Sequence, residues 1–212
     1  AMAAGAQLFL TTLDQPLVLF DFGADPQSSS EFVAVDDSIM GGSSSSALMP
    51  GDECATFTGK LVCERGGFAS VRTSGRDTCY SMDGTKGFEI VCRGDGNTTF
   101  KLSLRMDPRV DGVAYQQDFV GPALWSVCEL PWYGFVASWR GRIVADAPPL
   151  DPTKVRAVGL MVSKWDDHGV PRKDVRTGPF RLDVRVIRAL HWPTDAQRSR
   201  VPGYGPQLFP VA

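Results

Sequence analysis

Two stretches of this chain alternate apolar and polar residues with a period of two. Residues 98–106 read TTFKLSLRM, and residues 180–190 read FRLDVRVIRAL. This period places the apolar side chains on one face of a β-strand and the polar side chains on the other. A third stretch, VRAVGLMVS at 155–163, is apolar on both faces, which is typical of a central strand. These patterns predict a protein built from sheets.

Turn-forming residues separate the strand-like runs. Glycine occurs 22 times and proline 15 times, and the turn signals include RGG, DGTKG, GDGN and DAPPLDP. No stretch sustains a helical period, and only PLDPTKV indicates a short helical turn. Around ten strands with few helices and long loops predict an all-β protein, a β-sandwich of the jelly-roll type.

The chain divides into one β-sandwich domain over residues 17–190 and two irregular ends. We expect residues 1–16 to be an N-terminal extension and residues 191–212 to be an extended C-terminal tail. The prolines and glycines of the tail exclude a single strand or helix. Its apolar side chains are expected to pack on this domain or on another chain, and we assign three of them to partner binding: Trp192, Tyr204 and Phe209.

Charge is unevenly distributed, although the net charge is only −2. Residues 1–130 carry 17 acidic and 9 basic side chains, whereas residues 131–212 carry 7 acidic and 13 basic ones. No overall basic field favours nucleic-acid binding. Either the late bases form a patch for an acidic partner or membrane head groups, or the two halves interleave and their charges mix, which is favoured. Because no apolar run reaches membrane-spanning length, we expect a soluble or peripheral protein.

The five cysteines do not follow a metal-binding pattern. They are odd in number, and no two have C-x-x-C spacing. A zinc site is therefore not expected, and no cofactor is predicted. Since most of these cysteines sit in apolar, strand-like runs, we expect reduced thiols in a reducing compartment.

An ordered set of short motifs resembles the complex I intermediate-associated protein 30 family. The set runs from about Leu17 to Leu190, nearly the whole chain. Each motif alone is weak, whereas their order is specific. The motifs are DDSIMGGSSSS (36–46), FTGKL (57–61), GGFASVRT (66–73), GFEIVCRGDGNTTFKLSLR (87–105), AYQQDF (114–119), W-x-x-x-x-LPW (125–132), F-x-x-S-x-RGR (135–142), LDPTKVRAVGLMVS (150–163) and GPFRLDVRVI (178–187).

The resemblance implies a galactose-binding-like β-sandwich, similar to carbohydrate-binding modules. Members of the family are assembly or accessory factors of membrane electron-transfer complexes. The founding type acts in mitochondrial complex I assembly, and related domains occur in plastid proteins that serve photosystem biogenesis. The resemblance brings no catalytic residue. It implies protein subunits of a large membrane-associated complex as partners, on the matrix side of the mitochondrion or in a plastid.

Several functions stay open at this point. The favoured one is a non-enzymatic assembly or accessory factor that binds subunits of a complex of the respiratory complex I type. One alternative is a resident linker, stabilising subunit or assembly factor of a photosynthetic antenna or photosystem. A further alternative is a carbohydrate-binding module. A hydrolase using aspartates is the least favoured, because adjacent carboxylates on a strand point to opposite faces.

The polar stretch VDDSIMGGSSSS at 35–46 is predicted to be structural. A serine nucleophile needs a positioned base, and nothing marks His168 or His191 as one. Asp36 and Asp37 can instead accept hydrogen bonds from nearby amides. The glycines permit positive φ or close backbone approach, and we assign three to structural roles: Gly41, Gly42 and Gly67.

The GDGN segment at 94–97 is predicted to be a hairpin turn. Asp95 and Gly96 are assigned to this turn because D-G pairs are common in hairpins. Asp95 and Asn97 are also possible oxygen ligands for calcium, a minority alternative.

Aromatic and basic residues in the second half are the candidates for partner binding. An exposed tryptophan beside an arginine is typical of an interface hot spot, and exposed rings also serve sugar binding. The candidates are Trp139, Arg140, Arg142, Trp165, Arg172 and Lys173. Arg72 and Arg105 also fall in the shared motifs. One of the motif arginines is a candidate for contacting an anion in the sandwich cleft, although ion pairs on strand faces are favoured.

Overall fold

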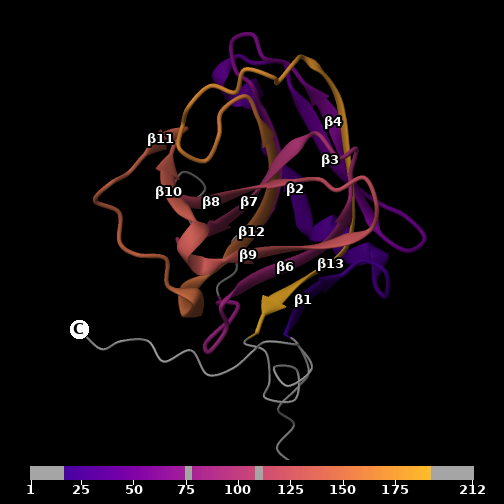
Figure 1. The fold of residues 1–212 in the computed structure, drawn as a ribbon, viewed down its shortest axis with the longest axis vertical. Helices are drawn as coiled ribbons and strands as arrows, with labels where there is room; N and C mark the ends of the chain where they lie inside the picture. The colour runs from indigo at the N-terminus through magenta and orange to yellow at the C-terminus, as the bar shows by residue number, and fades with distance from the viewer. Residues whose placement is uncertain (1–16, 75–77, 108–111, 192–212) are drawn as a thin grey trace, which may run out of the picture.

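Two antiparallel β-sheets face each other in the computed structural model, which describes residues 17–74, 78–107 and 112–191 (Figure 1). The first sheet has the strand order β3-β4-β13-β6-β9, and β1 pairs with β13 beside this path. Its strands are β1 (Val18–Asp21), β3 (Ser45–Pro50), β4 (Ala55–Leu61), β6 (Gly87–Arg93), β9 (Ser126–Pro131) and β13 (Gly178–Leu190).

The second sheet has the strand order β11-β10-β8-β7-β12-β5-β2. Its strands are β2 (Phe32–Ala34), β5 (Phe68–Thr73), β7 (Thr99–Arg105), β8 (Ala114–Val120), β10 (Val136–Trp139), β11 (Arg142–Ile143) and β12 (Ala157–Ser163). Short 3₁₀ helices lie in the described loops: η1 (Pro26–Glu31), η2 (Asp37–Met40), η3 (Trp132–Gly134) and η4 (Pro152–Lys154). The predicted all-β sandwich is confirmed.

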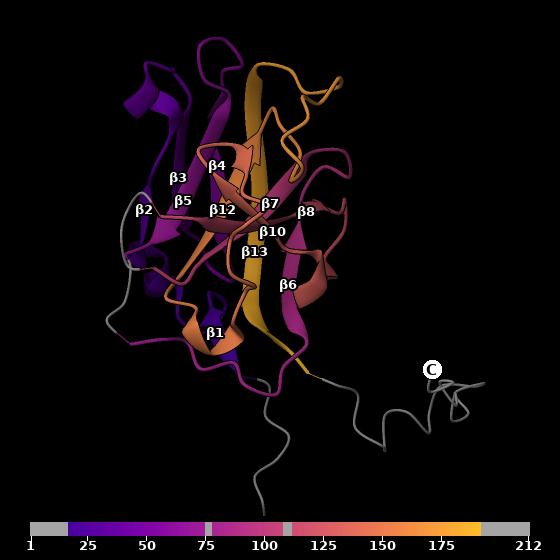
Figure 2. The same ribbon diagram turned by 90° about the vertical axis from the view of Figure 1, so that its left-hand side faces the viewer.

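The three patterned stretches form strands at the expected places. TTFKLSLRM contains β7, and VRAVGLMVS contains β12, which lies between β7 and β5 inside the second sheet. FRLDVRVIRAL forms most of β13, the long strand that runs through the first sheet in Figure 2. PLDPTKV contains η4, where the Asp151 carboxylate accepts a hydrogen bond from the Thr153 amide at 3.0 Å.

The core lies between the inward faces of the sheets. Phe100, Leu102 and Leu104 of β7 are fully buried there. Phe57 and Phe180 pack against each other with ring centroids 4.9 Å apart, and such contacts stabilise the core beyond their buried area.

The alternation of β13 breaks at one point that the sequence pattern did not reveal. The pattern placed Val186 on the core face with Val184. The pairing of β13 with β6 shifts between these residues, so that Ile187 is fully buried and Val186 is only half buried. A β-bulge of this kind inserts one residue and exchanges the faces of the residues that follow it.

The two halves of the chain interleave, as the favoured interpretation of the charge distribution required. Strand β13 lies between β4 and β6, so late bases face early acids. Arg185 pairs with Glu53 at 2.7 Å, and Arg188 pairs with Glu89. The strand order therefore brings bases of the second half against acids of the first half.

No helix in the described ranges is both long and apolar enough to cross a membrane. All five cysteines are free thiols, and the sulfur atoms of Cys92 on β6 and Cys128 on β9 lie 3.7 Å apart.

Candidate functional site

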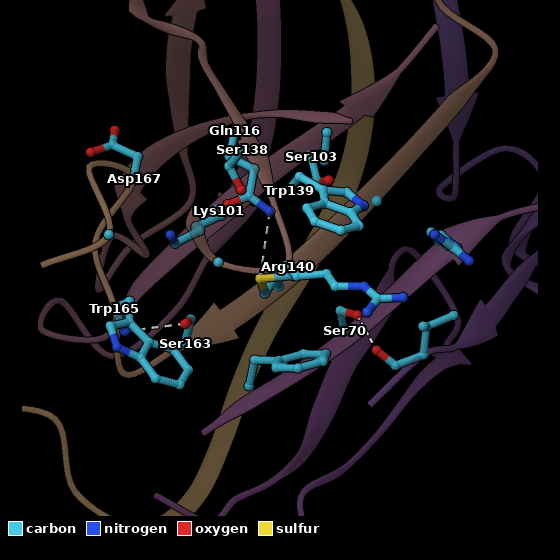
Figure 3. Close-up of a pocket in the computed structure, with 18 of the residues that line it drawn as sticks. Ser70, Lys101, Ser103, Gln116, Ser138, Trp139, Arg140, Ser163, Trp165 and Asp167 are labelled. Carbon is cyan, nitrogen blue, oxygen red and sulfur yellow. Dashed lines mark hydrogen bonds between the residues drawn. The ribbon is translucent and has the colours of Figure 1, made fainter. Parts of the chain in front are cut away.

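A cleft of about 690 Å³ opens on the outer face of the second sheet (Figure 3). The period of two that buries Phe100, Leu102 and Leu104 turns the intervening residues of β7 into this cleft. The floor is rich in hydroxyl and amide groups from five neighbouring strands: Ser70, Ser103, Gln116, Ser138 and Ser163. The cleft floor is therefore built on the outward face of the strands, and on β7 this face is the polar phase of the sequence pattern.

Exposed apolar side chains border this cleft. Ile39 and Met40 belong to η2, beside β5, and are 76% and 61% exposed. Trp139 and Ile143 belong to β10 and β11 at the other edge of the sheet and are 43% and 42% exposed. An opening lined by polar groups and bordered by exposed apolar side chains is typical of a recognition surface.

The β10–β11 hairpin has an unusual turn. Trp139 pairs with Arg142, and the two residues between them have positive φ values, 50° for Arg140 and 75° for Gly141. Left-handed conformation at both positions defines a type I′ turn, which favours Asn or Gly at the first position. An arginine in that position is strained, and such strain clusters at functional sites.

The hairpin holds its cation and its indole together. The Arg140 guanidinium lies 4.8 Å from the ring centroid of Trp139 (Figure 3). The turn also closely approaches the loop after β12, because a Cβ atom on Gly169 would lie 3.2 Å from the carbonyl oxygen of Gly141. The hairpin tip and that loop therefore meet beside the cleft.

The second tryptophan of the cleft, Trp165, lies in that loop. It is half buried and forms an isolated β-bridge with Pro171. The Lys164 ammonium lies 4.5 Å from the Trp165 ring centroid, and it donates a hydrogen bond to the Cys63 carbonyl oxygen at 2.7 Å. A cation thus covers one face of each indole in the cleft.

A partly buried charged network forms one end of the cleft. The buried Lys101 ammonium donates to the Asp166 carbonyl oxygen at 2.6 Å and lies 3.9 Å from the Asp118 carboxylate. Asp118 also pairs with Arg172, and the amide of Asp167 donates to the Asp118 carboxylate at 3.1 Å. These groups hold the loop after β12 against β7 and β8.

Burial shifts the pKa values of two groups in this network. Desolvation lowers the pKa of Lys101, although Asp118 opposes the shift. Desolvation likewise raises the pKa of Asp118, against the opposing effect of Lys101 and Arg172.

The structure brings together four of the residues that the sequence assigned to partner binding. Trp139, Arg140, Arg142 and Trp165 all line the cleft, and so do the motif arginines Arg72 and Arg105. The remaining assigned residues lie elsewhere. The Arg172 side chain is only 15% exposed and belongs to the internal network, whereas Lys173 is exposed outside the cleft. Trp192, Tyr204 and Phe209 lie outside the described residues.

Sequence reasoning did not assign the polar floor or the apolar border of this cleft. Only β7 carried a clear signal, since Lys101, Ser103 and Arg105 occupy the polar phase of that strand. Nothing in the sequence indicated which outer sheet face is hollowed. Ile39 and Met40 were noticed only as part of the polar stretch.

That polar stretch forms a second polar cluster, which we call the aspartate clasp: Asp36, Asp37, Ser44, Ser46, Gly67, Phe68 and Ser70. Asp37 is fully buried. One of its oxygens accepts a hydrogen bond from the Ser44 amide at 2.9 Å. The other accepts from the Ser44 hydroxyl at 2.7 Å and from the amides of Gly67 and Phe68 at 2.6 and 3.3 Å. Desolvation alone would raise the pKa of Asp37, but these hydrogen bonds lower it below its ordinary value.

Asp36 completes the clasp. Its carboxylate accepts hydrogen bonds from the Ser46 amide at 3.0 Å, the Ser46 hydroxyl at 2.6 Å and the Ser70 amide at 2.9 Å. Ser46 belongs to β3 of the first sheet, whereas Ser70 belongs to β5 of the second. The clasp therefore ties the two sheets together.

Glycines make room for the buried carboxylate. A Cβ atom on Gly42 or on Gly66 would lie 2.3 Å from atoms of the Asp37 carboxylate. Gly41 has a φ of 80° where η2 ends, and Gly67 has a φ of 114°. Gly42 and Gly66 thus leave the space that the buried Asp37 carboxylate occupies, which we call the glycine cradle.

The GDGN segment is a turn, but the predicted hairpin is wrong, because the segment joins β6 of the first sheet to β7 of the second and these strands do not pair. Asp95 acts within this turn. Its carboxylate accepts hydrogen bonds from the amides of Asn97 and Thr98 at 2.9 and 2.7 Å, and Gly96 has a φ of 81°. Partial desolvation of Asp95 opposes the shift, yet the hydrogen bonds from Thr98 and Asn97 lower its pKa below the ordinary value. Across the described ranges, no three His, Cys, Asp or Glu side chains gather closely enough to hold a metal ion.

Comparison with known proteins identifies relatives of the whole sandwich. The family model described as "Complex I intermediate-associated protein 30 (CIA30)" matches residues 20–184. An uncharacterised protein of Schizosaccharomyces pombe is 28% identical over 179 residues, covering 76% of this chain and 78% of its own length.

Solved structures share the fold at low sequence identity. The family 11 carbohydrate-binding module of Clostridium thermocellum, solved with a beta-1,3-1,4-mixed-linked tetrasaccharide, superimposes with a TM-score of 0.53 at 13% identity, covering 82% of this chain and 95% of the module. An agarase superimposes with a TM-score of 0.54 at 14% identity over 84% of this chain, which spans only 25% of the agarase. These likenesses establish a carbohydrate-binding-module type of sandwich.

Proposed function

This chain belongs to the complex I intermediate-associated protein 30 family, and from that premise we propose that it is a non-enzymatic assembly or accessory factor. In this role the sandwich binds subunits of a membrane electron-transfer complex of the respiratory complex I type. The observation that carries the proposal is the family match over residues 20–184, which includes strands of both sheets.

Three aspartates, Asp36, Asp37 and Asp118, are held by contacts within the chain, which supports a binding role over a hydrolytic one. The carboxylates of Asp36 and Asp37 each accept several hydrogen bonds from the protein itself. Asp118 is tied to Lys101 and Arg172. A pair of carboxylates working on a glycosidic bond must instead face the substrate from two sides.

The rigid sandwich suits a binding role. Its outer surface is preformed on strands that pack into the core, so that little conformational entropy is lost when a partner docks. The clasp supports this by fixing β3 to β5 through side-chain and backbone hydrogen bonds.

Native purification from the source membranes tests the proposal. The protein is isolated gently, and the subunits that migrate with it are identified. Intermediates of the respiratory complex I membrane arm are the expected companions and would put the protein on the matrix side of the mitochondrion. Photosystem or antenna subunits at fixed stoichiometry would instead establish a resident plastid subunit. A free monomer would overturn the proposal.

A carbohydrate-binding module is the second candidate. The cleft favours it, because two indoles and a row of hydroxyls line a hollow sheet face, and the similar clostridial module is solved with a tetrasaccharide. Calorimetric titration with that mixed-linked tetrasaccharide and a broader panel of neutral glycans tests this candidate. Saturable binding that Trp139→Ala abolishes would support it, and absence of binding across the panel would eliminate it.

A further inference from the structure

We propose that the cleft on the second sheet is the docking site for an extended acidic segment of a partner protein. Carboxylates of the segment pair with Arg140 and Arg142 on the β10–β11 hairpin, and its apolar side chains pack on the cleft border. This inference rests on the proposed function, since it specifies the surface and the partner chemistry through which an assembly or accessory factor binds.

The charge of the lining favours an acidic ligand. Four arginines line the cleft, against the two acidic side chains of Asp166 and Asp167; they are Arg72, Arg105, Arg140 and Arg142. Lys101 also lines the cleft, but its ammonium is buried and paired with Asp118. Amides of the chain itself already bond these acids: Asp166 accepts hydrogen bonds from the amides of His168 and Val170, at 3.0 and 2.7 Å, and Asp167 accepts one from the amide of Asp118 at 3.2 Å. The lining therefore presents an excess of positive charge to a ligand.

The hairpin places two guanidinium groups at the opening. Arg140 and Arg142 are both exposed, one in the turn and one on β11. Guanidinium groups bind carboxylates through paired, charge-assisted hydrogen bonds. The type I′ turn fixes the backbone of both residues, which lowers the entropy lost on binding.

The apolar border distinguishes a peptide from a glycan. Ile39, Met40 and Ile143 are aliphatic and exposed at the cleft. Aliphatic side chains of a partner can bury this surface, whereas a sugar stacks on open aromatic faces. One face of each indole here is already covered, by Arg140 at 4.8 Å and by Lys164 at 4.5 Å.

The floor suits an extended backbone. Serine side chains and Gly159, which has no side chain, occupy much of the floor and leave room above it; the serines are Ser70, Ser103, Ser138 and Ser163. Hydroxyl groups and the Gln116 amide line the same floor and can exchange hydrogen bonds with peptide groups. An extended segment can therefore satisfy its backbone while its acidic side chains reach the hairpin.

Site-specific photo-crosslinking tests this proposal in the full chain. A benzophenone amino acid replaces Ile143 at the cleft border or, as a control, Met49, which is 53% exposed on β3 of the other sheet. Each variant is illuminated in solubilised source membranes, and the crosslinked peptides are sequenced by mass spectrometry. The expected result is a crosslink from position 143 to an acidic segment of a co-purifying subunit.

Charge reversal makes the test specific. Arg142→Glu is expected to reduce crosslinking from position 143 by about tenfold or more, whereas Lys60→Glu, the same charge change at an exposed base on β4 of the other sheet, leaves it unchanged. Arg142→Gln, which removes the charge without reversing it, gives an intermediate loss. Thermal unfolding of each variant verifies the fold. A synthetic peptide of the crosslinked sequence then binds the purified chain, and more weakly at high salt.

The outcomes separate this inference from the proposed function. Crosslinks from position 49 alone, with subunits still co-purifying, would overturn the cleft and leave the assembly role standing. Absence of co-purifying subunits would overturn both.

A separate titration tests an acidic glycan as the ligand of the cleft. Oligogalacturonate, an acidic glycan, is titrated into the purified chain. Saturable oligogalacturonate binding that Arg142→Glu abolishes, together with no acidic peptide crosslink, would replace the peptide with an acidic glycan.

Discussion

The aspartate clasp and the cleft are both polar, both contact β5, and differ in where their polar groups point. In the clasp, Asp37 is fully buried and every described contact of its carboxylate is with the chain itself. In the cleft, Arg142 and Trp139 are exposed on a hairpin. A carboxylate can be buried in a folded protein only if hydrogen bonds compensate for its lost hydration. We therefore infer that the clasp serves to stabilise the fold. Exposed cation–indole pairs contribute little to folding, which leaves them available for recognition.

Truncating the clasp is expected to give the largest effect. Asp37→Ala leaves the buried amides of Ser44, Gly67 and Phe68 without their acceptor. Unsatisfied buried groups are costly, so the free energy of unfolding should fall by about 3 kcal/mol or more. Urea denaturation measures this. Ser38→Ala, an exposed neighbour in η2, is the control and should stay within about 0.5 kcal/mol. Equal losses in the two variants would remove the structural role from Asp37.

The glycine cradle sharpens the same contrast. In Gly66→Ala the new methyl group would lie 2.3 Å from the Asp37 carboxylate, so that the clasp must shift or break. Overpacking of this kind costs about 1–3 kcal/mol. Gly178→Ala is the matched control, because a Cβ atom there meets no heavy atom within 4 Å. Comparison of the two denaturation midpoints decides the matter. A Gly66→Ala variant as stable as the control would mean that the carboxylate moves freely.

Two adjacent residues near the cleft, Arg172 and Lys173, should differ in how much each stabilises the fold. Arg172→Ala removes one partner of the partly buried Asp118, whereas Lys173→Ala removes an exposed base. We expect Arg172→Ala to lower the free energy of unfolding by about 2 kcal/mol and Lys173→Ala to change it by less than about 0.5 kcal/mol. Chemical denaturation of both variants provides the measurement. A stable Arg172→Ala variant would return Arg172 to the candidates for partner binding.

Much of the fold followed from the sequence because strand periodicity is a local signal. Phe100, Leu102 and Leu104 could be placed in the core from alternation alone, and the family resemblance supplied the arrangement of the sheets. The bulge near Val186 could not be foreseen, since it depends on how β13 pairs with β6. The clasp was only half predictable. The carboxylates were expected to bind amides, but Ser70 lies 34 residues from Asp36 in the sequence and only the fold joins them.

The cleft was less predictable for a related reason. Trp139, Arg140, Arg142 and Trp165 were picked out by residue type, yet Arg172 was picked out on the same grounds and lies in an internal network. Residue type reports chemistry, whereas exposure depends on tertiary packing. The border of the cleft likewise comes from segments far apart in the sequence, namely η2, the β10–β11 hairpin and the loop after β12, and only the fold brings them together.

The pH dependence of the free energy of unfolding should show how much the negative charge of Asp37 contributes to the clasp. Hydrogen bonds hold the pKa of Asp37 in the folded state below its ordinary value. The carboxylate therefore adds stability above the unfolded pKa of about 3.9, and this contribution is lost as the pH falls through the lower, folded pKa. Asp37→Asn should be less stable than the wild type at neutral pH, and the difference should shrink toward acid pH. Unfolding free energies measured across the acid range test this. A constant difference would assign the effect to shape alone.

Trp139→Ala should have the smallest effect on folding and a large effect on binding. The indole is 43% exposed at the sheet edge, so its removal should cost about 1 kcal/mol or less. Tyr133→Ala is the control, because Tyr133 is 93% exposed and lies outside the cleft. If the cleft docks an acidic segment, Trp139→Ala should reduce the recovery of co-purifying subunits by about tenfold, as hot-spot aromatic residues do, and Tyr133→Ala should not. A Trp139→Ala variant that unfolds as readily as Asp37→Ala would end the distinction between clasp and cleft, since both clusters would then serve the fold.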